Sequence, residues 1–197
     1  ITKQGYLPEI TFQQFYDRTG VEFIVVGACI SREEKATFSY KTTPDFEVAK
    51  AIRISCGLPI LYNTVQINGD VYGDGCLFEN TPISYFTETE DMLNKTLVFH
   101  INAKTKQYEH KLSNYILKLY SCISKTLSNL QLQNYQQYLV NLTEINLTNL
   151  LDLTDAEKSG LIEYGYSATK EHIINRFVHN TGNNDNNDNN DNNDNND

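Results

Sequence analysis

The hydrophobic positions of the chain fall into short continuous runs and longer spaced runs. Residues 22–30 (EFIVVGACI) form an almost unbroken apolar run, which predicts a strand buried on both faces. Shorter apolar stretches predict further strands at residues 36–40, 96–101 and 138–145. These four segments are the strands predicted outside the hairpin described below.

The connections contain helical patterns. Pro44 at a first helical position predicts a helix that runs to about Ser55. Residues 112–130 carry apolar side chains on one helical face, which we expect to lie in the core. The expected buried positions are Phe46, Ala49 and Ile52 in the first helix, and 112, 116, 119, 120, 123 and 127 in the second.

A last helix is predicted to begin after Thr154, because Glu157 stands three residues later and completes a capping box. We expect this helix to kink at Gly165 and to continue to about Phe177. Strands that alternate with helices are typical of an α/β layered domain.

The sharpest local pattern is a β-hairpin. Residues 65–67 and 71–72 flank Asn68-Gly69, and both turn residues tolerate positive φ. The second strand leads directly into Gly73-Asp74-Gly75. Glycines on both sides of an aspartate leave its backbone accessible to another segment, which would suit a catalytic side chain. A tight turn uses the same three residues, so the local pattern leaves both interpretations open.

The charge and composition of the chain argue against some classes of function. Residues 183–197 are five Asn-Asn-Asp repeats, so we expect a domain at 1–179 and a disordered tail at 180–197. Without the five aspartates of these repeats, the formal net charge of −9 becomes −4. This acidity argues against a nucleic-acid surface and against stable docking on anionic lipid. The sequence does not exclude a basic patch formed by residues that folding brings together.

Metal and membrane motifs are missing from the sequence. The four cysteines include no C-x-x-C pair, and His172 and His179 are too far apart on a helix to share a metal. We therefore expect no metal, no cofactor and reduced thiols in a cytoplasmic protein. The chain has no apolar run of about 18 residues, so no transmembrane segment is expected.

Seven residues in order resemble the C-terminal signature of patatin-like phospholipases. That family has a helix ending in Ala-x-x-(small)-Ser, a proline, a hairpin, Asp-Gly-Gly or Asp-Gly-Ala, and Asn-x-Pro. The matching residues are Ala51, Ser55, Pro59, Asp74, Gly75, Asn80 and Pro82. Weaker similarities extend the resemblance over most of residues 7–178.

The resemblance implies a fold and a mechanism. The fold would be a three-layer α/β/α domain with a central, mostly parallel sheet, whose N-terminal part lies outside this chain. A serine in G-x-S-x-G would attack an ester and Asp74 would accept its proton, supported by Gly73, Gly75, Asn80, Pro82 and Pro59. Neither that serine motif nor the Gly-rich oxyanion loop occurs in the 197 residues, so this chain alone should be inactive.

The expected activity is hydrolysis of carboxylic esters in phospholipids or neutral lipids, during transient contact with a membrane surface. The sequence departs from the family at Cys76, where Gly or Ala is usual, and at Ile54, where a small residue is usual. A Cβ at position 76 would be costly if that backbone required positive φ. A catalytically inactive patatin-fold module that binds lipid or protein is the alternative. The third interpretation is an unrelated α/β domain in which Gly73-Asp74-Gly75 is only a turn.

Overall fold

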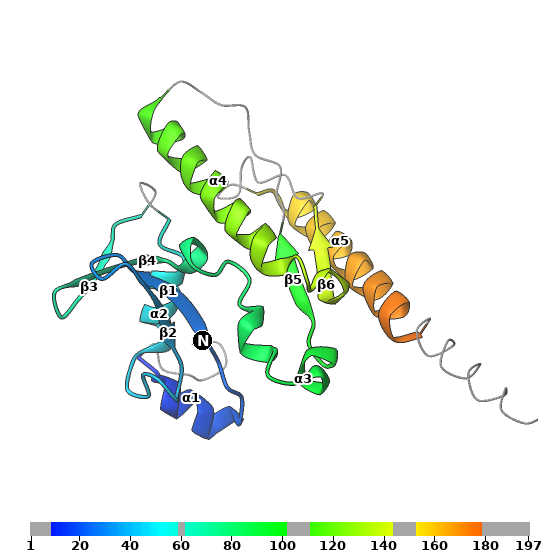
Figure 1. Cartoon of the computed structure of the whole chain (residues 1–197), viewed down its shortest axis with the longest axis horizontal. Helices are drawn as coiled ribbons and strands as arrows, with labels where there is room; N and C mark the ends of the chain where they lie inside the picture. The colour runs from blue at the N-terminus through cyan, green and yellow to red at the C-terminus, as the bar shows by residue number, and fades with distance from the viewer. Residues whose placement is uncertain (1–8, 59–61, 102–110, 144–152, 179–197) are drawn as a thin grey trace, which may run out of the picture. The chain divides into compact units, whose positions relative to one another are not determined.

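The computed structural model describes residues 9–58, 62–101, 111–143 and 153–178 (Figure 1). The chain forms two compact units, one from residues 1–85 and 107–134 and the other from residues 86–106 and 135–197. Each unit is treated by itself below. Pro59, His179 and the Asn-Asn-Asp repeats lie outside the described residues.

The first unit is built around a four-stranded sheet with the strand order β2-β1-β4-β3. Its helices include α2, which packs against β1 and β4. In chain order its elements are α1 (Phe12–Thr19), β1 (Val25–Cys29), β2 (Glu34–Phe38), α2 (Val48–Ser55), β3 (Val65–Ile67), β4 (Asp70–Asp74), the 3₁₀ turn η2 (Gly75–Leu77) and α4 (Leu112–Leu132). Another 3₁₀ turn, η3 (Ile83–Phe86), follows η2 in the sequence.

The sequence predicted a mostly parallel sheet, and this is wrong for these four strands, because every pairing among them is antiparallel. The cause is the shortness of two connections. A four-residue turn joins β1 to β2, and the predicted Asn68-Gly69 turn joins β3 to β4 with φ of 52° and 90°. Such turns can only reverse the chain, whereas a parallel pair needs a crossover of a dozen residues or more. The α/β class itself is confirmed.

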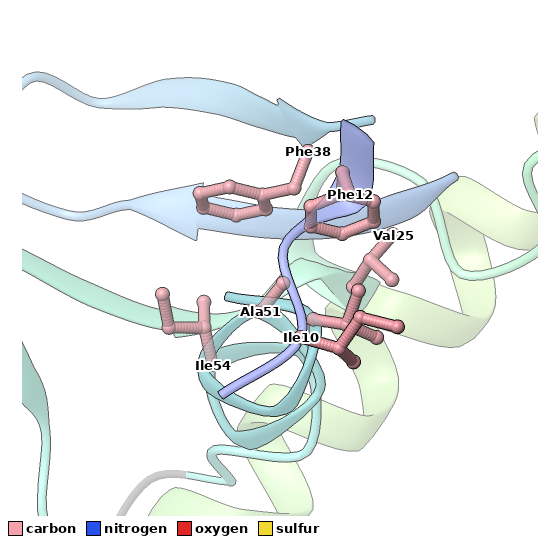
Figure 2. Close-up of a cluster of buried hydrophobic side chains, with 7 residues drawn as sticks. Ile10, Phe12, Val25, Phe38, Ala51 and Ile54 are labelled. Atoms are coloured by element: carbon pink, nitrogen blue, oxygen red, sulfur yellow. The ribbon is translucent and has the colours of Figure 1, made fainter. Parts of the chain in front are cut away.

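The predicted strand at 22–30 is confirmed as β1, which is buried along its whole length. Around it lies a core of seven buried residues (Figure 2). They come from the residues before α1, from α1, from β1 and β2, and from α2: Ile10, Phe12, Val25, Phe38, Val48, Ala51 and Ile54.

Helix α2 begins at Val48, not at Pro44 as predicted. Residues 44–46 form a turn, closed by the Phe46 N–H, which donates to the Thr43 carbonyl at 3.0 Å. Glu47 is extended and forms a β-bridge with Thr11, and the Val48 N–H donates to the Ile10 carbonyl at 3.0 Å. This later start changes which face is buried. The buried residues are Val48, Ala51 and Ile54, whereas Ile52, which was expected inside, is 37% exposed.

Helix α4 confirms the predicted helix but reverses its predicted orientation. Of its residues, Ser124, Ser128 and Leu132 are buried. Most of the face that was predicted to be core lies in solvent, including Leu112 at 75% and Leu119 at 49% exposure. Hydrogen bonding explains part of this orientation, because the polar side has partners within the same unit. The Gln131 side chain donates to the Phe78 carbonyl at 2.6 Å.

The second unit contains a two-stranded parallel sheet of β5 (Val98–Ile101) and β6 (Leu139–Leu142), close to the strands predicted from the sequence. Helix α5 packs against β6. The remaining elements are α3 (Glu90–Asn94), the 3₁₀ turn η4 (Gln136–Tyr138), α5 (Asp155–Ile173) and a terminal π-helical turn, η5 (Ile174–Val178).

The capping box predicted at the start of α5 is confirmed, with Thr154 as the N-cap and Glu157 as its reciprocal partner. The predicted helix continues through Gly165 without a break, since α5 runs uninterrupted from Asp155 to Ile173. A single glycine costs a helix only about 1 kcal/mol relative to alanine, which a 19-residue helix can absorb.

Candidate active site

Asp74 is the last residue of β4, in the middle of the first sheet. It is opposite Gly27 of β1 in the antiparallel ladder, and its N–H donates to the Gly57 carbonyl at 3.3 Å. The carboxylate Oδ1 accepts a hydrogen bond from the Cys76 N–H at 2.9 Å, so the side chain caps η2. Backbone contacts on both sides of the residue therefore fix where this carboxylate lies.

The two glycines beside Asp74 have different roles. A Cβ on Gly75 would lie 2.5 Å from the Val26 carbonyl oxygen, a backbone atom that cannot move aside. A Cβ on Gly73 would meet only ordinary contacts of 3.6 Å or more. Gly75 is therefore required so that the chain after Asp74 can pass against β1, while Gly73 is not required by steric contacts.

Cys76 is accommodated without backbone strain. Among the described residues, the non-glycine positions with positive φ are Glu33 and Asn68, so the condition under which a Cβ at position 76 would be costly is not met. Its Sγ donates to the Tyr120 hydroxyl of α4 at 2.9 Å. Burial raises the pKa of this thiol to about 11. The thiol therefore stays protonated at neutral pH and is a poor nucleophile.

The other departure from the family pattern, Ile54, is matched by a glycine in the sheet. Ile54 is fully buried on α2. A Cβ on Gly27 would lie 2.7 Å from Ile54 Cγ2. Gly27 on β1 thus leaves the space that the Ile54 side chain fills. Gly27 is also the residue of β1 that pairs with Asp74.

A cavity of about 420 Å³ contains Asp74. Its apolar lining includes Ile24, Val26 and Pro82, and its polar lining includes Ser55, Glu79 and Asn80. Gly75, Asn80 and Pro82, which the sequence grouped with Asp74, therefore line one cavity with it. Gly73 is not among its lining residues, and Pro59 lies outside the described part of the chain. Ser55, one of the seven residues that carry the family resemblance, also lines this cavity.

Sequence reasoning missed an ion pair whose carboxylate partner, Glu79, is buried and lines this cavity. Glu79 is 7% exposed, and its Oε2 accepts from Lys35 Nζ of β2 at 2.9 Å. Its Oε1 accepts from the Ser84 N–H at 3.3 Å. Burial lowers the pKa of Lys35, but the contacts with Glu79 and Tyr85 together outweigh burial and raise this pKa overall. The two residues are 44 positions apart, and no local pattern in the sequence pairs them.

Burial raises the pKa of Asp74 above its ordinary value, and the hydrogen bonds from Cys76 only partly oppose this. The cause is the loss of water around the charged form. A carboxylate with a raised pKa binds a proton more readily, which is the property that a general base requires. The site can therefore accept a proton from a hydroxyl group held in the cavity.

The described residues contain no group of three or more His, Cys, Asp or Glu side chains placed to hold a metal ion. All four cysteines are free thiols. In the described part of the chain, no helix has the length and apolarity needed to cross a membrane.

Comparison with known proteins supports the resemblance over the N-terminal part of the chain. Residues 3–87 match the family model for patatin-like phospholipases. A probable lipid hydrolase, 463L, of Invertebrate iridescent virus 6 is 31% identical over 86 residues, which are 44% of this chain and 30% of that protein. The uncharacterized protein R571 of Acanthamoeba polyphaga mimivirus is 31% identical over 97 residues, or 49% of this chain and 30% of that protein.

A solved structure extends the similarity beyond residue 87. VipD from Legionella pneumophila covers 88% of this chain with a TM-score of 0.57, at 16% sequence identity. At that identity the match establishes a common fold only. The chain spans about a third of the length of these proteins, namely 30% of each viral relative and 37% of VipD.

Proposed function

Because residues 3–87 belong to the patatin-like phospholipase family, we propose that this chain supplies the general base of a lipid acyl hydrolase. The single observation that carries the proposal is the position of Asp74. Its carboxylate is held by backbone contacts in a cavity with an apolar side, and burial raises its pKa.

In the proposed mechanism, the carboxylate of Asp74 takes the proton of a serine hydroxyl as its oxygen attacks the ester carbonyl. The bond from the carbonyl carbon to the alcohol oxygen then breaks, and Asp74 gives its proton to the departing alcohol, which leaves the acyl-enzyme. The carboxylate, ionised again, takes a proton from the water that attacks the acyl-enzyme and returns it to the serine oxygen as the fatty acid leaves. Because the 197 residues contain no G-x-S-x-G, the serine and the oxyanion donors come from a polypeptide segment outside them. That segment would also complete the three-layer fold with its parallel strands.

The proposed substrates are carboxylic esters of phospholipids or neutral lipids. The apolar lining from Ile24, Val26 and Pro82 suits an acyl chain, and the polar lining around Asp74 suits the ester group. The enzyme would act in the cytoplasm, at the periphery of a membrane.

The test uses the reading frame extended upstream of Ile1 until it includes a G-x-S-x-G. Hydrolysis of a nitrophenyl butyrate ester and of a phospholipid is measured for the wild type and for Asp74→Asn. Loss of a general base should lower kcat by about 10²- to 10⁴-fold. The matched control is Asp70→Asn on the same strand, whose carboxylate pairs with Arg32 at the surface, and which should keep its activity.

Two results would oppose the proposal. Unchanged hydrolysis by Asp74→Asn would remove Asp74 from the chemistry. Specific esterase activity of the 197-residue chain alone would mean that the nucleophile lies within it. A complete upstream domain without the serine motif would favour the second candidate, a catalytically inactive lipid-binding or interaction module, which the absence of G-x-S-x-G from these residues supports.

A further inference from the structure

Helix α4 buries polar side chains on one face and leaves a row of apolar side chains exposed on another. On the inner side, Tyr120 accepts from Cys76, and Gln131 donates to the Phe78 carbonyl. Ser124 and Ser128 are also buried. These contacts fix the rotation of the helix about its axis, so its outward face is determined by the fold of the first unit.

The outward face is a continuous apolar stripe. Six of its side chains are exposed by 40% to 75%. The stripe consists of Leu112, Tyr115, Ile116, Leu119, Ile123 and Leu130. Spacings of three, four and seven residues keep these side chains along one line of the helix. Single exposed apolar residues are ordinary, but a contiguous row marks an interaction surface.

A row of lysines runs beside the stripe. Lys111, Lys118 and Lys125 are seven residues apart and exposed. Lys111 and Lys118 are one helical turn from Tyr115, at the edge of the stripe. No aspartate or glutamate occurs from residue 110 to residue 143. In a chain with net charge −9, this helix is therefore locally cationic.

We propose that the stripe of α4 docks on an anionic lipid surface. An amphipathic helix with apolar residues on one face and lysines beside them lies in the plane of a membrane interface, with its apolar side chains among the acyl chains. The adjacent lysines add electrostatic attraction to anionic headgroups. The acidity of the whole chain had argued against such docking, and this helix is the local basic patch that the sequence left open.

Helix α4 is linked to the candidate site by a hydrogen bond. The same helix that carries the stripe contacts Cys76 through Tyr120, two residues from Asp74. The choice of lipid as the partner rests partly on the proposed function. Vesicle binding is measured without any hydrolysis, so either proposal can fail while the other stands.

The test is flotation of the 197-residue chain with vesicles of phosphatidylcholine alone and of phosphatidylcholine mixed with phosphatidylserine. We expect binding to the mixed vesicles, little binding to the neutral ones, and a decrease with added salt. Leu119→Ser combined with Ile123→Ser should weaken binding at least tenfold. Each of Lys118→Gln and Lys125→Gln should weaken it about fivefold.

Matched controls come from α5, where Ile162 is 73% exposed and Lys158 forms only a local ion pair. Ile162→Ser and Lys158→Gln should bind as the wild type does, and circular dichroism should be unchanged in every variant. The proposal is overturned if the chain binds neither vesicle, or if the stripe and control variants bind equally. It is also overturned by a second set of results. Light scattering would show that the chain is a dimer, only the stripe variants would dissociate this dimer, and vesicles would not compete with dimer formation.

Discussion

Strand β1 and helix α4 are both rich in apolar residues, and the fold treats them in opposite ways. All five residues of β1 are buried, whereas α4 turns its apolar stripe to solvent and buries serines. The strand is surrounded because two neighbouring strands and α2 pack against it. The helix is held at its polar side by a few hydrogen bonds. Apolar sequence alone therefore does not decide burial, and the available partners do.

The largest effect should follow a side chain added where two backbones touch. Gly75→Ala places a Cβ 2.5 Å from the Val26 carbonyl oxygen, and the free energy of unfolding should fall by about 3 kcal/mol or more. Gly73→Ala is the matched control, because its Cβ has room, and it should change stability by no more than about 1 kcal/mol. Urea unfolding of both variants measures the difference. Equal destabilisation would show that β4 is not held against β1 as described.

The next effect tests how tightly β1 and α2 fit together. Ile54→Ala should cost about 2–5 kcal/mol by leaving a void. Gly27→Ala should also destabilise the fold, since its Cβ meets Ile54 Cγ2 at 2.7 Å. In the double variant, the new methyl group at position 27 occupies part of the void at position 54. The double variant should therefore lose less unfolding free energy than the two single variants added together, by about 0.5–3 kcal/mol. Strict additivity in a double-mutant cycle would contradict this packing.

The success of sequence reasoning depended on whether a feature is set by neighbouring residues or by distant ones. The β1 run, the Asn68-Gly69 turn and the Thr154 capping box were predicted correctly, because each depends on neighbouring residues. Their structure follows from local rules that a sequence displays directly.

Features that depend on distant partners were predicted less well. The late start of α2 depends on the bond from Val48 to Ile10, and the inverted α4 depends on contacts with Cys76 and Phe78. At the site, Asp74 was predicted from the family motif, and its catalytic role stays a prediction. Glu79 was missed because its partner, Lys35, is far away in the sequence.

A smaller effect concerns the pH dependence that Asp74 adds to stability. Its folded pKa is raised by burial, so the native state binds more protons than the unfolded chain between the two pKa values. Stability is then lost as the pH rises through that interval. Asp74→Asn keeps an oxygen to accept from the Cys76 N–H and removes this loss. The urea midpoint of Asp74→Asn should therefore rise relative to that of the wild type as the pH increases from acid to neutral. A variant that is less stable at neutral pH would indicate a structural aspartate.

The smallest expected effect closes the comparison between β1 and α4, because it repeats one substitution on a buried and an exposed residue. Ile54 on α2 is fully buried against β1, and Ile123 on α4 is 46% exposed. Ile123→Ala should therefore change the free energy of unfolding by less than about 0.5 kcal/mol, while Ile54→Ala costs several times more. Alanine also favours a helix slightly over isoleucine, so a small gain is consistent. A loss of 2 kcal/mol or more at Ile123, a size typical of a buried isoleucine, would mean that the stripe is already covered in the folded chain and is not free to meet a lipid surface.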